Sequence, residues 1–219
     1  MPVSIRVTKI HHACLTIDDG RTRLLLDPGQ LGPRPGLDGI DAVLITHRHS
    51  DHFDPDLVEE ALRRGIPVWA PGDALDELGG LDARGEDGLH EAVTGTTLRI
   101  GTLPVQVAGN RHAEVHPTLL GPANRAYLID GRVLVTGDEH PVLPDRLTAL
   151  VTPVDAPWLR VADLIRYVRA LRPKLVVGVH DGLLNADGLA VARHVIESLR
   201  NEGTARATIL ADGEAIIAP

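Results

Sequence analysis

Three histidines and two aspartates fall within the nine-residue stretch THRHSDHFD, at positions 46–54. This stretch follows directly on the apolar run DAVLI. Alternating imidazoles and carboxylates pack poorly in a core, but they form a good ligand set for a divalent cation of hard to borderline character. We therefore interpret the stretch as one part of a metal site, whose other ligands must come from elsewhere in the chain.

Three further junctions between an expected strand and a loop carry the same kinds of side chain. VQVAG leads into His112, RVLVTG into Asp138, and KLVVGV into His180. Functional side chains of α/β proteins collect beyond the carboxyl ends of strands, because rigid elements aim them there. His116 competes with His112 for the same role. We prefer His112, which follows its strand more closely, and expect His116 to contact either the substrate or the side chains that support the ligands. The candidate metal ligands are thus His47, His49, Asp51, His52, His112, Asp138 and His180.

These residue types suit a pair of cations. Two divalent cations about 3.5–4 Å apart repel each other, so they need a carboxylate and a hydroxide between them. Asp138 is the candidate bridge. One cation would be held by three histidines, His47, His49 and His112. The other would be completed by Asp51, His52 and His180. The bridging water becomes hydroxide near neutral pH and attacks a carbonyl carbon or a phosphorus. The catalytic candidates are Asp51 and His116.

The motif HRHSDH resembles the H-x-H-x-D-H signature of the metallo-β-lactamase fold superfamily, and the later His, Asp and His follow in that family's order. Asp27, which closes TRLLLD, matches an early aspartate that usually has a supporting or structural role. More narrowly, GNRHAEVHP, NRAYLIDGRVLVTGD and VHDGLLN are similar to small bacterial metal-dependent hydrolases related to the ascorbate-6-phosphate lactonases. The resemblance covers essentially the whole chain. It implies an αββα sandwich, two facing mixed β-sheets with helices on their outer faces, as a single domain over residues 1–219.

The resemblance implies two divalent ions, Zn²⁺ first with Mn²⁺ or Fe²⁺ as alternatives, and hydrolysis of a small-molecule lactone, ester or phosphoester. Antibiotic hydrolysis is disfavoured, because metallo-β-lactamases proper usually lack a carboxylate at the bridging position. Nucleases of this fold generally carry an added domain or a basic arm, whereas 219 residues barely cover the core fold. Three alternatives stay open: a mononuclear iron oxygenase acting on a thiol or persulfide, a nuclease or phosphodiesterase, and a metal-stabilised binding protein.

Composition limits the partners. The 22 Lys and Arg residues against 30 Asp and Glu give a net charge of −8, which argues against nucleic acid. No apolar run approaches the ~20 residues of a membrane span, and MPVSIRVTKI lacks the apolar stretch of a signal peptide, so we expect a cytoplasmic protein without a membrane partner. Oligomerisation is left open. Cys14, the one cysteine, is expected to be a small buried residue without a disulfide.

The expected elements follow hydrophobic periodicity and turn signals. DDG at 18–20 predicts a hairpin turn, and Asp54 followed by Pro55 predicts the start of a helix that ends at Gly65. A second long helix over 159–172 should bury an apolar stripe, made of Leu159, Ala162, Leu164, Ile165, Val168 and Leu171. Helices are also expected at 72–80 and 187–200. Strands are expected at 3–10, 14–18, 22–27, 41–46, 67–70, 96–101, 104–109, 126–131, 132–137, 149–154, 174–180, 208–212 and 214–219.

The loops near the proposed site have a local cationic bias, from Arg48, Arg111, His116, Asn124 and Arg125. If the substrate is anionic, Arg125 or Arg111 can bind it with a charge-assisted pair. Arg48 lies between two ligands and is at least as well explained by packing. His90 and His194 are expected in solvent. Three further histidines are left open between pocket wall and surface: His11, His12 and His140.

Overall fold

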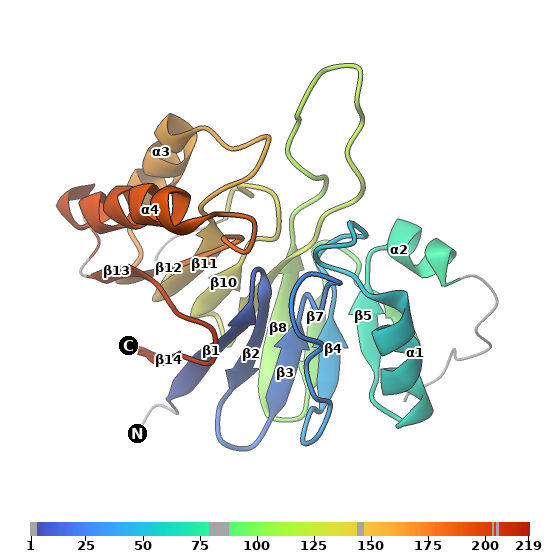
Figure 1. Ribbon diagram of the computed structural model, residues 1–219. Coiled ribbons are helices and arrows are strands. Elements are labelled where there is room, and N and C mark those ends of the chain that lie inside the picture. The colour runs from blue at the N-terminus through green and yellow to red at the C-terminus, as the bar shows by residue number, and fades with distance from the viewer. Residues whose placement is uncertain (1–3, 79–87, 144–146, 203, 205) are drawn as a thin grey trace.

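The structure is a computed structural model that describes residues 4–78, 88–143, 147–202, 204 and 206–219. Within these residues two seven-stranded sheets pack face to face (Figure 1). The first sheet has the order β14-β1-β2-β3-β4-β5-β6, with strands at Ala215–Ala218, Ile5–His11, Cys14–Asp18, Arg23–Leu26, Ala42–Leu44, Val68–Ala70 and Leu89–Glu91. The second has the order β13-β12-β11-β10-β9-β8-β7, with strands at Arg206–Ile209, Leu175–Val179, Ala149–Pro153, Val133–Val135, Ala126–Ile129, Leu103–Ala108 and Thr97–Ile100.

Three apolar layers hold the sheets and helices together. The middle layer joins inward-facing residues of both sheets, such as Ile17 of β2 and Val105 of β8, and contains no helical residue. A second layer packs the first sheet against α1 (Pro55–Arg63) and α2 (Gly72–Glu77). A third packs the second sheet against α3 (Val161–Leu171), α4 (Ala186–Ser198) and the 3₁₀ helix η1 (Leu199–Glu202). The order helix, sheet, sheet, helix confirms the predicted αββα sandwich.

The helix ends follow local sequence signals. The side chain of Asp54 caps α1 by accepting from the backbone N–H of Asp56, and Pro55 begins the helix, as predicted. In α3 the predicted stripe is wrong at one position, because Ala162 is exposed while Leu164 and Val168 are buried. Two residues along a helix correspond to about 200° of rotation, so Ala162 faces away from Leu164. The predicted end of α2 at residues 79–80 lies outside the described residues.

Strand direction brings the functional ends to one side of each sheet. β1 and β3 both run antiparallel to β2, and β3 runs parallel to β4, so their carboxyl ends share one edge. In the second sheet β8 and β10 both run antiparallel to β9, and β10, β11 and β12 are parallel. Their carboxyl ends therefore also share an edge. The segment 109–125 between β8 and β9 stands out beyond this edge as a long loop (Figure 1). None of the helices in the described ranges is long and apolar enough to cross a membrane.

Candidate metal centre

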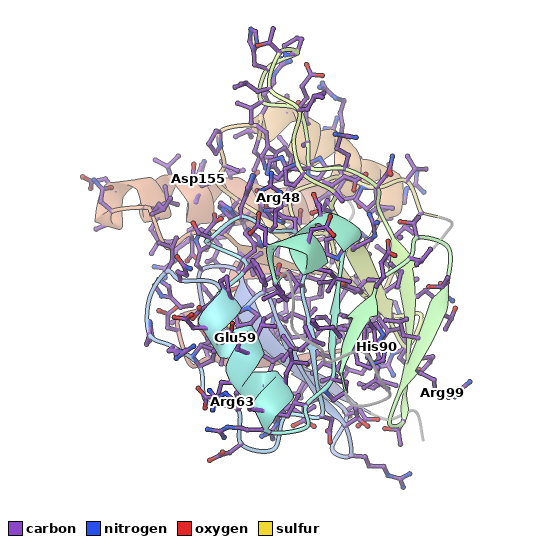
Figure 2. The ribbon with its side chains drawn as sticks, turned by 90° about the vertical axis from the view of Figure 1, so that its right-hand side faces the viewer. Arg48, Glu59, Arg63, His90, Arg99 and Asp155 are labelled. Carbon is purple, nitrogen blue, oxygen red and sulfur yellow. The ribbon has the colours of Figure 1, made fainter. Side chains whose placement is uncertain are left out.

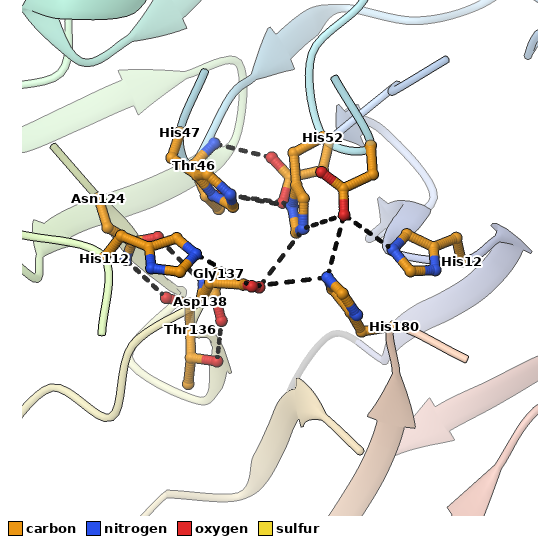
Figure 3. A network of polar contacts seen from close by, with 12 residues as sticks. His12, Thr46, His47, His52, His112, Asn124, Thr136, Gly137, Asp138 and His180 are labelled. Atoms are coloured by element: carbon orange, nitrogen blue, oxygen red, sulfur yellow. Dashed lines mark hydrogen bonds and ion pairs between the residues drawn. The ribbon is translucent and has the colours of Figure 1, made fainter. Parts of the chain in front are cut away.

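Six strand ends, three from each sheet, deliver the side chains of the centre (Figure 3). The first sheet supplies His12 after β1, Asp27 after β3 and the loop 46–52 after β4. The second sheet supplies His112 after β8, Asp138 after β10 and His180 after β12. The structure therefore brings together all seven of the residues that the sequence nominated as ligands.

The ligand atoms form three overlapping groups, in each of which they lie within 4.8 Å of one another. The first group is His47, His49 and His112. The second group contains Asp51, His52 and His180, together with His12. The third group shares residues with both and consists of His47, His52 and Asp138.

Asp138 lies between the first two groups. Its Oδ2 is 3.4 Å from His112 Nε2 and 3.5 Å from His180 Nε2, and its Oδ1 is 3.4 Å from His52 Nε2. The carboxylate thus faces histidines of both groups, which is the arrangement that a bridging role needs. Asn124 holds the Asp138 loop: it is fully buried, accepts from the Asp138 N–H at 3.1 Å and donates to the carbonyl of Thr136 at 2.9 Å. Asn124 therefore supports the Asp138 loop, which corrects its grouping with the substrate-facing cationic residues.

Several buried atoms at the centre have no hydrogen-bond partner among the described residues. They are His47 Nε2, His52 Nε2, Asp138 Oδ1 and both ring nitrogens of His180. Three of them, His52 Nε2, His180 Nε2 and Asp138 Oδ1, approach neighbouring ligand atoms at 3.2–3.5 Å but without hydrogen-bond geometry. A buried polar atom left unpaired costs about 1–3 kcal/mol. Divalent cations would satisfy Asp138 Oδ1 and one ring nitrogen of each of these histidines, so the residues fit a metal centre.

The other ring nitrogen of three ligand histidines has an acceptor. His52 Nδ1 lies 2.8 Å from Asp27 Oδ2, and His112 Nδ1 lies 2.7 Å from the carbonyl oxygen of Ala113. His47 Nδ1 lies 3.0 Å from Thr46 Oγ1, which itself donates to Asp27. A proton held on Nδ1 leaves the Nε2 lone pair free for a metal. Asp27 thus has the supporting position that the resemblance implied.

The charges around the centre set the protonation of its ligands. Burial lowers the pKa of His47 and of His49, so both rings are neutral at pH 7. Burial also opposes a charge on His52, but the carboxylates of Asp27 and Asp138 outweigh it and raise the pKa of His52 to about 9. Burial would raise the pKa of Asp138, but the neighbouring imidazoles outweigh it and the pKa is lowered. His47, His49 and Asp138 are thus in the form that binds a cation, whereas His52 must first lose a proton.

Backbone strain gathers at the centre. His12, Asp27 and His180 have φ angles of 51°, 47° and 66°, in the left-handed region that glycine favours. Such conformations cost roughly 1–3 kcal/mol each and cluster at functional sites, where they fix the direction of a side chain. Each of the three ends a strand and turns its side chain into the centre.

Sequence reasoning missed Trp158 and left His12 undecided. Trp158 Nε1 donates to Asp138 Oδ2 at 2.9 Å, so the indole both holds the bridging carboxylate and flanks the centre. The signal available in the sequence was an aromatic residue in PVDAPW, directly after β11. His12 is buried, its pKa is lowered by burial, and its Nε2 lies 3.3 Å from Asp51 Oδ2.

Other histidines lie outside the three ligand groups. His116 is exposed in the loop 109–125, where its Nδ1 accepts from the N–H of Thr118, and its catalytic role stays a prediction. His11 pairs with Asp212 at 2.6 Å. His140 is half-buried, stacks on Tyr167, and burial lowers its pKa to about 4.

Two expectations about surface and buried residues have clear outcomes. His90 was predicted to lie in solvent, but it is half-buried and stacks on Trp69 with ring centroids 4.6 Å apart, so that prediction was wrong. His194 is exposed on α4, as predicted. Cys14 is 5% exposed and packs in the layer under α1, which confirms its interpretation as a small buried residue.

The arginines near the centre differ in what they bind. Arg48 pairs with Glu77 and Asp73 and lies beside α2 (Figure 2), which agrees with its interpretation as a packing residue and not a substrate-binding one. Arg125 Nε donates to the carbonyl of Ala92 at 2.6 Å, and its Nη1 donates to two further carbonyls. Arg111 is exposed and donates to the carbonyl of Gly121. Of the two arginines predicted to bind an anion, Arg111 therefore has the more available guanidinium.

Comparison with known proteins agrees with this geometry. The family model described as the beta-lactamase superfamily domain matches residues 6–180. Protein Rv0786c of Mycobacterium tuberculosis is 29% identical over 197 residues, which cover 85% of this chain and 89% of that protein. The UPF0173 protein PF0020 of Pyrococcus furiosus is 24% identical over 186 residues, covering 78% and 80%.

Solved structures share the fold at low sequence identity. Igni18, described as a novel metallo hydrolase from Ignicoccus hospitalis, superposes with a TM-score of 0.69 at 17% identity and covers 98% of both chains. The metallo-beta-lactamase fold protein YhfI from Bacillus subtilis has a TM-score of 0.71 at 15% identity, covering 98% of this chain and 99% of its own. These likenesses confirm the metallo-β-lactamase fold. The narrower likeness to the ascorbate-6-phosphate lactonases stays a prediction.

Proposed function

The chain belongs to the beta-lactamase superfamily, and we propose that it is a hydrolase that depends on two divalent cations. One observation carries the proposal. Buried imidazole nitrogens from both sheets and one carboxylate oxygen, Asp138 Oδ1, have no hydrogen-bond partner among the described residues, and the Asp138 carboxylate lies between the two groups of ligands. Borderline divalent cations such as Zn²⁺ suit this mixture of nitrogen and oxygen ligands, and Mn²⁺ or Fe²⁺ are the alternatives.

Each side chain has a defined task in this proposal. Two bound cations would supply polarisation of the scissile group and activation of a water for attack on it. One cation would be held by His47, His49 and His112, which form the first cation position. Another would be held by Asp51, His52 and His180, which form the second cation position, and Asp138 would join the two. Asp27 orients His52 directly and His47 through the hydroxyl of Thr46.

The nucleophile is a water rather than a side chain. Cys14 is the one cysteine of the sequence; it is buried in the apolar layer under α1, and burial raises the pKa of its thiol. A thiol that stays protonated and packed away from the centre cannot attack a substrate there. Hydrolysis by activated water needs no covalent intermediate with the chain, which agrees with a centre built only of cation ligands and their supports.

The proposed substrate is a small molecule with a lactone, ester or phosphoester group and an anionic substituent. Arg111 directly precedes the ligand His112, is exposed, and carries a guanidinium with donors to spare beyond its bond to Gly121. A charge-assisted hydrogen bond from this guanidinium to a carboxylate or phosphate is typically worth about 1.5–3 kcal/mol. Arg111 would thus fix the substrate while the cations act on its reactive group.

Metal counting combined with a substrate screen tests the proposal. Protein stripped of metal and reloaded with Zn²⁺ or Mn²⁺ should bind two ions per chain. It should then hydrolyse at least one member of a panel of lactones, esters, thioesters and phosphodiesters, and a chelator should abolish the activity. Binding of a single iron ion with oxygen consumption, or two bound ions with no hydrolysis across the panel, would contradict the proposal.

A further inference from the structure

His12 stands among the ligands of the second cation position but makes different hydrogen bonds. It is 1% exposed, and the centroid of its ring is 4.0 Å from that of His180. By distance alone its Nε2 could serve as a ligand beside those of Asp51, His52 and His180. Distance does not decide the matter, because a histidine binds a cation only through a nitrogen that carries no proton.

The partner of the other ring nitrogen decides where the His12 proton is. The backbone N–H of Gly182 donates to His12 Nδ1 at 3.0 Å. An amide N–H can only donate, so Nδ1 carries no proton, and a neutral ring must carry its proton on Nε2. That Nε2 lies 3.3 Å from Asp51 Oδ2. His12 therefore presents an N–H to the Asp51 carboxylate where a ligand would present a lone pair.

The ligand histidines show the opposite arrangement. Asp27 and the carbonyl of Ala113 can only accept, so they hold a proton on Nδ1 of His52 and of His112. Each of these rings in its neutral form therefore has a bare Nε2, which His52 reaches by releasing its second proton. We infer that His12 is a positioning residue that holds Asp51 from outside the second cation position and is not a ligand itself. This inference rests on the proposed function.

Keeping His12 out of the ligand set preserves an open position. A cation held by Asp51, His52, His180 and the bridging Asp138 already has four protein ligands. A fifth from His12 would leave little room for water or substrate, whereas catalytic zinc sites keep a position open for them. As a donor, His12 instead fixes the orientation of the Asp51 carboxylate, which is the role that supporting residues have around metal sites.

Close packing at Gly182 holds the His12 ring in this orientation, and a backbone hydrogen bond fixes its loop. A Cβ added at Gly182 would lie 3.0 Å from both the Cβ and the Nδ1 of His12, and 2.9 Å from the Nε2 of His11. The φ of Gly182 lies outside the left-handed region, so it is space and not backbone conformation that calls for glycine there. The N–H of His180 also donates to the carbonyl of His12 at 3.1 Å, which ties the two loops together.

Ring ¹⁵N spectroscopy tests the inference directly. In protein labelled at histidine and loaded with Zn²⁺, the His12 ring should show a proton on Nε2 and none on Nδ1, while His52 and His112 should show the reverse. His12 with its proton on Nδ1 and its Nε2 bound to zinc would overturn the inference. The tautomer is also readable without metal, so a protein that takes up no metal would refute the proposed function while the His12 tautomer is still measured.

Variants provide a second test with metal binding as the readout. His12→Ala should still bind two cations, with the affinity of the second reduced about 10–100-fold, as for other supporting residues. His180→Ala should lose the second cation. His12→Gln, whose amide can donate to Asp51, should recover part of the affinity. His11→Ala is the matched control and should leave metal binding unchanged. Loss of the second cation in His12→Ala as complete as in His180→Ala would overturn the inference.

Discussion

Replacing Asp27 by asparagine should move the proton of His52 to the wrong nitrogen. The Asp27 carboxylate is 1% exposed and accepts from the Thr46 N–H at 2.7 Å, the Thr46 hydroxyl at 2.7 Å and His52 Nδ1 at 2.8 Å. The carbonyl oxygen of an asparagine can still accept from the Thr46 N–H, and the hydroxyl can rotate. The new amide N–H, however, faces His52 and can only donate. His52 must then carry its proton on Nε2, where it blocks a cation.

The expected effects are large enough to measure. One charge-assisted hydrogen bond is lost, which is worth about 1.5–3 kcal/mol and corresponds to a Tm lower by roughly 3–12 °C for a chain of this length. Loss of a supporting partner weakens metal binding about 10–100-fold, and the wrong tautomer places Asp27→Asn at the upper end, about 100-fold or 2.7 kcal/mol.

The loss of stability should depend on pH. The pKa of His52 is raised from 6.5 to about 9 in the folded protein. Burial lowers this pKa, but the nearby carboxylates raise it by more, and Asp27 contributes most among them. A raised pKa stabilises the fold fully below about 6.5, and this contribution disappears as the pH rises through about 9. The difference in Tm between wild type and Asp27→Asn should therefore be greatest near pH 6 and shrink above pH 9.

Thermal unfolding of the metal-free proteins and competition with a chromophoric zinc chelator provide the two measurements. Asp41→Asn is the matched control, because Asp41 lies on the same sheet and also accepts a backbone N–H, that of Arg23 at 2.7 Å, but is exposed and distant in the fold from the ligands. If Asp27→Asn has the Tm and the zinc affinity of Asp41→Asn, the reasoning about the His52 tautomer is refuted.

Three further predictions follow from the centre. Asp138→Asn should reduce bound metal to one ion or none. Glu139→Gln changes the residue next to the proposed bridge and should retain both ions, so equal losses of metal in the two variants would mean that the bridge is misassigned. The affinity for the second cation should rise about tenfold per pH unit between pH 7 and 9, because His52 must release a proton, and a flat titration would contradict its raised pKa. Arg111→Ala should raise KM about 10-fold or more for an anionic substrate and leave metal content unchanged, and an unchanged KM would exclude anion recognition by Arg111. Arg125→Ala should instead lower Tm, because three hydrogen bonds to backbone carbonyls are lost.

Much of the fold and the ligand set could be predicted from short stretches of sequence. The cap at Asp54 and the alternation of apolar strands with polar loops are local signals, and they placed the helix α1 and most strands correctly. The ligand candidates were nominated in the same way, because each is a metal-binding residue type directly after an apolar strand. Strand direction then brings such residues together at the edge of a sheet, so residue type and position along the chain were sufficient to nominate them.

The roles of the supporting residues were decided only by the tertiary structure. The Nδ1 partner of His12 is an amide 170 residues away, and the indole of Trp158 reaches Asp138 across 20 residues. Asn124 and Arg125, adjacent in the sequence, turn to a buried loop and to backbone carbonyls instead of to substrate. The chemistry of a histidine depends on which of its two nitrogens carries the proton. That choice is made by a donor or acceptor from a distant part of the chain, so the sequence alone nominated the ligands while the fold determined that His12 is not one of them.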